Sequence, residues 1–175
     1  CIPVDANNVG CVVGTSGDHA FFWDHGTFQL GWYFKHEQRA FALNDGFLAA
    51  GAVEGKACAW DCLMPSSPGV LDHRLHPIGE ALDLNDRMHV VGWSAPAPGA
   101  QSVATLWNGR ATQLDLNPLA IQVPGETPFV RLTSAIAIDR QDRIAGVGIL
   151  ADGTQRAFLL TPVKPGVPAT WFREP

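Results

Sequence analysis

The sequence predicts an all-β fold of four four-stranded antiparallel repeats that form a β-propeller, with four blades as the favoured number. The first observation is a twelve-residue pattern, seen at 81–92 as ALDLNDRMHVVG, which occurs four times and ends in glycine each time. The second is a five-residue segment with a shared alanine that follows each copy in register. Four-stranded units of about 40–45 residues are typical of propeller blades. An open fragment of a larger ring is the alternative architecture.

The twelve-residue pattern has the form of a β-hairpin. An Asn or Asp lies seven residues before each closing glycine, and two small or β-branched residues come directly before that glycine. Asn and Asp favour tight turns, and β-branched residues favour strands. Each copy therefore predicts a strand, a tight turn and a second strand. The closing glycines are Gly14, Gly51, Gly92 and Gly146, and the turn residues are Asn7, Asn44, Asn85 and Asp139.

The second pattern predicts a third strand in each unit. Its copies are HAFFW, KACAW, VATLW and RAFLL, and three of them end in tryptophan. Because Trp23, Trp60 and Trp107 recur in register, we expect their large rings to form the core between units. A fourth strand follows at 26–31 and at 109–114. The chain is predicted to be a single repeat domain over 1–175, with units at 1–31, 39–79, 80–116 and 132–174.

Strand direction alternates in such a unit, so the loops fall on two opposite faces. First hairpins and third-to-fourth turns share the hairpin-tip face. Second-to-third loops and the connectors between units share the other, which we call the long-loop face. Loops that depart from a repeat usually carry specificity, and the longest departures collect on the long-loop face. They are 32–38, 94–101, 117–131 and 150–154.

Composition excludes some classes of function. Hydrophobic residues make up 46% of the chain and charged residues 17%, which is typical of a folded protein. The net charge of −5 gives no basic surface for nucleic acid. No apolar run approaches the roughly 18–20 residues of a transmembrane segment. The four cysteines permit two disulfides in three connectivities. Cys58 aligns with a phenylalanine of other units, so a buried small hydrophobic residue is the alternative there.

Unit one resembles the HAF repeat family of bacterial proteins. The resemblance rests on the hairpin at 7–14 (NNVGCVVG), on His19-Ala20-Phe21-Phe22-Trp23, and on the Gly26 to Gly31 strand. The other units depart from the His-Ala-Phe tripeptide, and the last lacks the tryptophan. The family is one of extracellular repeats, so the resemblance implies an extracellular or periplasmic location. It implies no activity and no catalytic residue.

Two groups of residues raise the question of a metal site. The segment 72–76 (DHRLH) places two histidines three apart beside a carboxylate, and zinc takes such ligands. Residues three apart on a strand point to opposite faces, so a polar outer strand is favoured. The hairpin tips are rich in Asp and Asn, which bind calcium but also populate tight turns for backbone reasons. A calcium-loop consensus is absent from the sequence, and we predict no metal site.

Off-pattern side chains on the long-loop face are the predicted ligand-binding residues. Trp93 follows a closing glycine where the other units carry Thr, Ala or Val. Aromatic rings at such positions stack on a sugar or anchor a partner, with packing under the insertions as the alternative. The predicted set is Trp32, Tyr33, His36, Glu37, Trp93, Glu126 and Arg131.

These observations predict a non-enzymatic extracytoplasmic module for recognition or scaffolding, which binds a protein or glycan through the long-loop face and uses no cofactor. One alternative is a carbohydrate-binding lectin that uses Trp32, Tyr33 and Trp93. A further alternative is a glycoside-acting enzyme with loop carboxylates such as Glu37 and Glu126. An enzyme is less favoured because the sequence has no nucleophile elbow, phosphate-binding loop or dinucleotide fingerprint.

Overall fold

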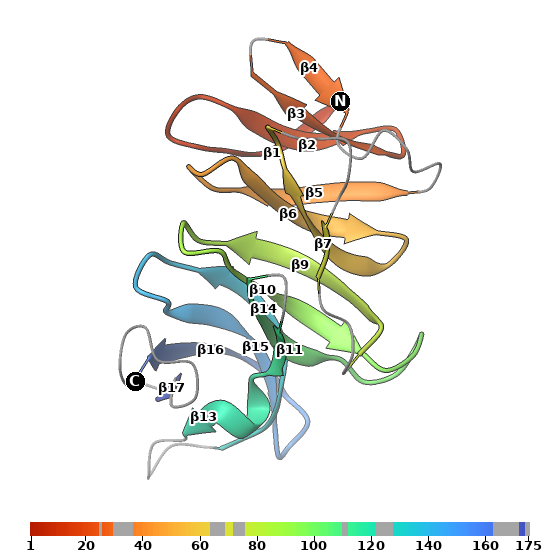
Figure 1. The fold of residues 1–175 in the computed structure, drawn as a ribbon. Coiled ribbons are helices and arrows are strands. Elements are labelled where there is room, and N and C mark those ends of the chain that lie inside the picture. The colour runs from red at the N-terminus through yellow and green to blue at the C-terminus, as the bar shows by residue number, and fades with distance from the viewer. Residues whose placement is uncertain are drawn as a thin grey trace.

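Four separate β-sheets are stacked in chain order, with the N-terminal and C-terminal sheets at opposite ends of the stack (Figure 1). The structure is a computed structural model. It confirms an all-β fold built from antiparallel units, and it shows no closed propeller among the parts that it describes. The described residues are 1–24, 26–29, 37–63, 69–71, 76–109, 112–121, 128–162 and 172–173.

Each sheet is an antiparallel meander, and β13 adds one parallel strand to the last. The first contains β1 (Ile2–Ala6), β2 (Val12–Ser16), β3 (His19–Trp23) and β4 (Thr27–Gln29). The second contains β5 (Gln38–Leu43), β6 (Leu48–Val53), β7 (Lys56–Asp61) and β8 (Gly69–Val70). The third contains β9 (Ile78–Leu84), β10 (His89–Ala95), β11 (Val103–Asn108) and β12 (Thr112–Asp115). The fourth contains β14 (Phe129–Ile138), β15 (Ile144–Leu150), β16 (Gln155–Pro162), β17 (Phe172–Arg173) and β13 (Ala120–Ile121), which follows the 3-10 turn η1 (Asn117–Leu119).

One backbone geometry explains why the hairpin pattern repeats. The turn Asn accepts a hydrogen bond on its side-chain oxygen from the N–H four residues later, as Asn44 does from Leu48 at 2.9 Å. The third residue after it takes positive φ in every unit, where Asn, Asp and Gly are the usual occupants. Only the first unit uses glycine there. These residues are Gly10, Phe47, Met88 and Asp142, with φ of 90°, 60°, 64° and 63°.

The closing glycine is required by close packing. A Cβ atom added at Gly51 would lie 1.9 Å from the carbonyl oxygen of Arg39 and 2.8 Å from the Trp60 ring. Both distances are far below van der Waals contact. Glycine at this point of the second strand therefore lets the first strand and the tryptophan ring of the third strand lie close against it.

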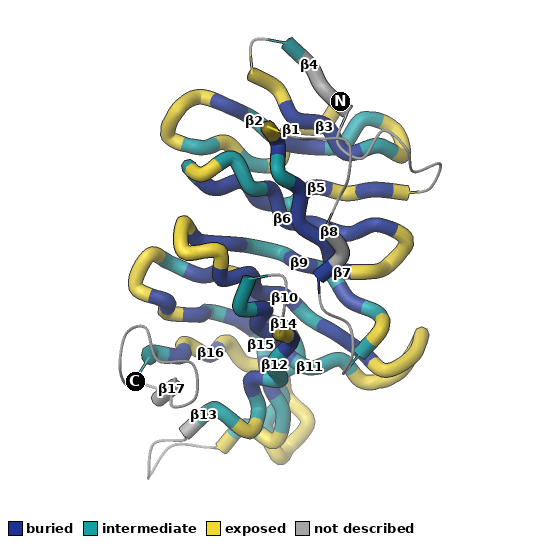
Figure 2. The backbone as a smooth tube through the Cα atoms, viewed as in Figure 1, coloured by how far each residue is buried: buried dark blue, intermediate teal, exposed yellow. Residues whose placement is uncertain are grey.

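Successive sheets pack face to face. Each has an N-side face toward the preceding sheet and a C-side face toward the following one. Between the second and third sheets, the C-side face contributes small side chains such as Ala50 and Ala59, and the N-side face contributes Leu84 and Trp107. Figure 2 shows the buried residues concentrated between the sheets. The apolar positions of one strand thus alternate between two different interfaces.

The recurring tryptophans are core in only two of the three units. Trp60 is 0% exposed and Trp107 is 1% exposed, so the prediction is confirmed there. Trp23 is 36% exposed because it lies on the N-side face of the first sheet, at the end of the stack. The sequence pattern cannot distinguish an end unit from an internal one.

The four cysteines are free thiols, so neither permitted disulfide is formed. Cys58 is fully buried, in agreement with its alignment to phenylalanine positions. Burial raises its pKa. Burial, followed by the Asp61 charge, raises the pKa of Cys62 to about 12.

Loops lie on two faces, as the alternation of strand direction predicts. The backbone N–H of Cys62, after the third strand, donates to the carbonyl of Phe47 at a hairpin tip (2.9 Å). On the opposite face, the N–H of Glu54 in a second-to-third loop donates to the carbonyl of Glu37 in a connector (3.1 Å). The second-to-third loops and the connectors between units therefore lie together on the long-loop face, as predicted.

Candidate functional site

The structure describes three of the seven predicted ligand-binding residues. Glu37 is exposed and forms an ion pair with Arg39 at the start of the second sheet. Trp93 of β10 lines a cavity together with the loop between β10 and β11, and Arg131 of β14 contacts Gln101 of the same loop. The structure thus brings two predicted residues to one loop and leaves Glu37 at another unit. Outside the described residues are Trp32, Tyr33, His36 and Glu126.

A cavity of about 380 Å³ opens on the long-loop face beside Trp93. Strands β9 and β10 form one wall, the β10–β11 loop forms another, and Ser134 of β14 belongs to the next sheet. Small-molecule sites commonly measure about 300–1,000 Å³ and combine apolar walls with a few polar groups. The lining residues are Ile78, Trp93, Ala95, Ala97, Pro98, Gly99, Ala100, Ser102 and Ser134.

The indole ring of Trp93 is held in a fixed orientation. Its register places it opposite Glu80 of β9, and its Nε1–H donates to Oε2 of Glu80 at 3.1 Å. The side chain is half-buried, so part of its surface is accessible. An aromatic ring that is anchored by its polar atom loses little conformational entropy when a ligand stacks on it.

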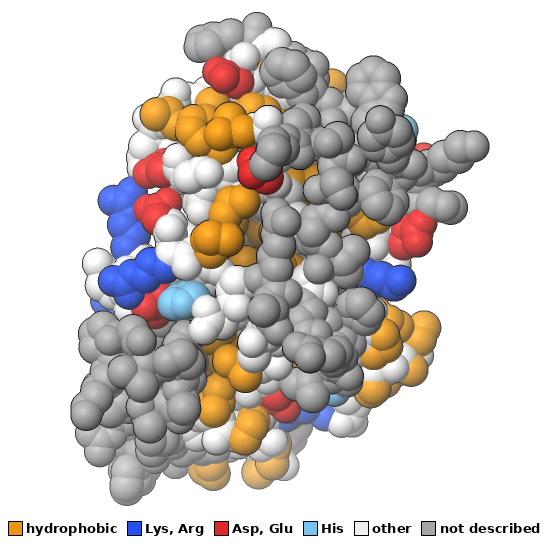
Figure 3. All heavy atoms as spheres, in the orientation of Figure 1, with side chains coloured by type: hydrophobic (Ala, Val, Ile, Leu, Met, Phe, Trp, Pro, Cys, Tyr) orange, Lys and Arg blue, Asp and Glu red, His pale blue; other side chains and the backbone are white. Residues whose placement is uncertain are grey.

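The loop that closes the cavity is also anchored. Its backbone turns through a hydrogen bond from the N–H of Ala100 to the carbonyl of Ala97 (3.1 Å), with Gly99 at a φ of 74°. The Arg131 guanidinium donates to the side-chain oxygen of Gln101, which ties the loop to β14. Arg131 therefore braces the loop. Figure 3 shows hydrophobic side chains gathered over this loop.

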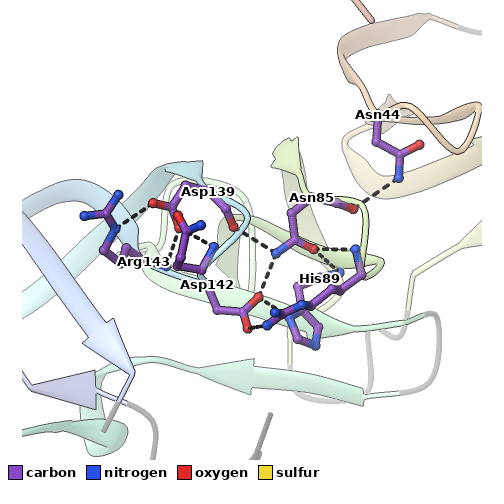
Figure 4. Close-up of polar contacts among 8 residues, drawn as sticks. Asn44, Asn85, His89, Asp139, Asp142 and Arg143 are labelled. Atoms are coloured by element: carbon purple, nitrogen blue, oxygen red, sulfur yellow. Dashed lines mark hydrogen bonds and ion pairs between the residues drawn. The ribbon is translucent and has the colours of Figure 1, made fainter. Parts of the chain in front are cut away.

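A series of side-chain hydrogen bonds runs along the hairpin-tip face, where each turn Asn donates to a carbonyl of the next unit. Asn7 donates from Nδ2 to the carbonyl of Asn44 (3.2 Å), and Asn44 donates to the carbonyl of Asn85 (3.1 Å). Asn85 donates to the carbonyl of Asp139 at 3.0 Å. We call this series the Asn ladder. It ends at Asp139, whose carboxylate has no N–H to donate and instead accepts from Arg143 at 2.6 Å (Figure 4).

The Asn ladder meets a buried carboxylate between the third and fourth sheets. Asp142 is 2% exposed, and its Oδ1 accepts from Asn85 Nδ2 at 2.7 Å. The same carboxylate lies 2.7 Å from Nδ1 of His89 (Figure 4). It also lies 2.6 Å from the Arg87 guanidinium. Buried charge is costly unless it is paired and hydrogen-bonded, and this carboxylate is both. The cluster fixes the junction of the two sheets.

Carboxylates and one guanidinium line a smaller groove of about 280 Å³ at the hairpin tips. Arg140 of the fourth unit lies 3.0 Å from Asp45 and 3.3 Å from Asp86. Hydrogen bonds from the side chain and backbone of Asn8, with the Arg140 charge, lower the pKa of Asp45. Figure 3 shows this band of Asp, Arg and His side chains along the edge with the hairpin tips. The carboxylates of the groove are thus engaged by the protein's own groups.

Metal ligation finds no geometric basis in the described part of the chain, where no group of three His, Cys, Asp or Glu side chains could hold an ion. His76 is the only described member of the 72–76 segment. Its Nδ1 lies 2.9 Å from Ser94 Oγ, which lies 2.7 Å from the Thr105 hydroxyl. His76, which lies between β8 and β9, therefore joins a chain of polar contacts with Ser94 and Thr105 of the third sheet.

Sequence reasoning predicted Trp93 and the loop 94–101 on this face, but it missed Ile78, Ser102 and Ser134 of the cavity wall. Glu80, which orients Trp93, could have been predicted from the sequence. Aligning the two strands of the hairpin pairs Glu80 of β9 with Trp93 of β10. Ser134 could not have been predicted, since its approach depends on how the fourth sheet packs against the third.

Comparisons with known proteins give no further information about this site. A scan against protein-family models, a search of curated proteins and a search of solved structures each found no match. Among the residues that the structure describes, no helix has the length and apolar character needed to cross a membrane.

Proposed function

We propose that this chain is a non-enzymatic recognition or scaffolding module that binds its ligand at the Trp93 cavity on the long-loop face. The observation that carries the proposal is the cavity of about 380 Å³, in which a half-buried indole is oriented by Glu80. The hydrogen-bonded ring and braced loop support a site that exists before the ligand arrives, which favours affinity.

The scaffold proposed for this site is a set of propeller-type blades. Four-stranded meanders stacked in chain order support that proposal, as does the repeat length. An extracytoplasmic location is proposed from the resemblance of unit one to HAF repeats.

A carbohydrate is the second candidate ligand, and the composition of the cavity favours it over other small molecules. Sugars present an apolar face that stacks on an indole and hydroxyls that exchange hydrogen bonds with serines. Trp93, Ser102 and Ser134 supply both kinds of contact in one cavity. For a glycoside-acting enzyme the described residues give no comparable support, because Glu37 is paired with Arg39.

The test begins with labelled protein on a broad glycan array and on a displayed peptide library. Any selective binder is then measured against Trp93→Ala and Trp93→Phe. We expect Trp93→Ala to weaken binding at least tenfold, and Trp93→Phe to retain part of it because a ring remains. The matched control is Met88→Ala, a 42% exposed side chain in the hairpin-tip turn of the same unit. Binding that survives Trp93→Ala, or that is lost in Met88→Ala, would overturn the assignment to this cavity.

A further inference from the structure

The C-side face of the last sheet exposes positions that are buried in every other unit. Leu159 of β16 is 40% exposed. Its counterparts Phe22, Ala59 and Leu106 are 3%, 4% and 0% exposed, because the following sheet covers them. The neighbouring Ala157 is likewise exposed, whereas the alanines at its position are buried in the first three units.

The N-side face of the first sheet shows the same contrast. Pro3 is exposed, while the alanines at its position in the other units are 0% exposed. Ala6 is exposed, while Leu43, Leu84 and Ile138 at its position are 6%, 6% and 8% exposed. The stack of four sheets therefore has two apolar outer faces of opposite type: one matches the C-side half of an internal interface and the other matches the N-side half.

We propose that these two faces associate between copies of this chain, so that the last sheet of one copy packs on the first sheet of the next. The argument is continuity with an interface that the chain forms three times. In each case the C-side face of one sheet packs on the N-side face of the following sheet through the same positions. Each copy carries both halves, so a second copy supplies the complementary surface. The contact is heterologous, and such contacts extend head to tail unless the rotation closes a ring.

Polar groups at the hairpin tips set the strength of this contact. The fourth unit has Asp139 in place of a ladder Asn, so it cannot donate to the Asn7 carbonyl of another copy. It also has Ala137 where Asp5 and Asp83 stand in the first and third units, and those two accept N–H groups of the next unit, Asp5 from Leu43 at 2.8 Å. The contact between copies therefore lacks these two kinds of hydrogen bond and depends mainly on apolar packing. We expect it to be reversible and weaker than the interfaces within the chain.

The experiment is sedimentation velocity of the whole chain over a wide range of concentrations. Wild-type protein is expected to show a mass that rises with concentration. Ala6→Arg blocks the N-side face and Leu159→Arg blocks the C-side face, and each variant alone should remain a monomer. Mixed together they should form a 1:1 dimer and nothing larger, because each supplies the face that the other has lost. Leu63→Arg is the matched control: Leu63 is 67% exposed in a turn of the second sheet, and this change should leave association unaltered.

Three outcomes would overturn the proposal. The first is a wild-type protein that is monomeric throughout, as it would be if the two ends met within one chain. The second is self-association that survives in either single variant, which indicates another surface. The third is a mixture of the two variants that stays monomeric. Circular dichroism and thermal unfolding of both variants, whose changed positions are exposed, establish that loss of association is not loss of folding.

Discussion

Asn85→Asp tests whether the Asn ladder holds the third and fourth sheets together. Asn85 donates at 2.7 Å to the Asp142 carboxylate and at 3.0 Å to the Asp139 carbonyl (Figure 4). The substitution removes both donations and leaves two acceptors at those distances. A hydrogen bond to a charged group contributes about 1.5–3 kcal/mol and a neutral one about 0.5–1.5, so we expect a loss of about 2–4 kcal/mol at pH 7.

The loss should depend on pH, and its sign is fixed by the new pair of acids. Burial and the neighbouring carboxylate raise the pKa of the introduced carboxyl above its unfolded value, because two carboxylates in contact do not both ionise readily. Such a group stabilises the fold below its unfolded pKa, and the contribution is lost as pH rises through the folded pKa. The deficit relative to wild type should therefore shrink as pH falls from 7 toward about 4.

Urea unfolding at several pH values measures this effect. Asn85→Ala is the control, since it loses the same donations without adding an acid, and its deficit should not follow the same pH dependence. The exchanged pair Asn85→Asp with Asp142→Asn restores a donor opposite an acceptor and should be more stable than the sum of the two single changes predicts. A variant as stable as wild type at pH 7, or a deficit that is independent of pH, would refute this reasoning.

Three further predictions concern the closing glycine, the last turn carboxylate and the buried thiols. Gly51→Ala should destabilise the fold by about 3 kcal/mol or more, because its Cβ would overlap the Arg39 carbonyl, whereas Gly46→Ala, whose nearest neighbour lies at 3.4 Å, should be nearly neutral in urea unfolding. Burial opposes ionisation of Asp139, but hydrogen bonds from Arg143 and Gln141 outweigh it and lower its pKa, so its stabilisation is present above the unfolded value and is lost as pH falls through the folded one. Asp139→Asn should therefore cost about 0.5 kcal/mol at pH 6 and nothing at strongly acidic pH, and an equal cost at both would contradict it. Finally, a thiol reagent at pH 8 should modify only the exposed Cys1 rapidly, since the other three thiols are buried and burial raises their pKa, and all four should react in denaturant.

The strands and turns of each unit could be predicted from the sequence because short-range interactions determine them. The turn Asn, the residue with positive φ three positions later and the closing glycine act within a single hairpin, so they leave a readable pattern in the sequence. Trp93 stood out for the same reason, as a departure from that pattern beside an insertion. The two-face arrangement of loops followed from strand alternation alone.

The relation between units was decided only by the tertiary structure. Stacking determined that Trp60 is covered while Trp23 is partly exposed, that the Asn side chains reach across to neighbouring carbonyls, and that Ser134 lines the same cavity as Trp93. The face-to-face stack of the four sheets also depends on tertiary packing, because the rotation between neighbouring sheets arises from the fit of their two faces. A repeat pattern describes each face separately, and the angle at which two faces pack is a property of neither alone.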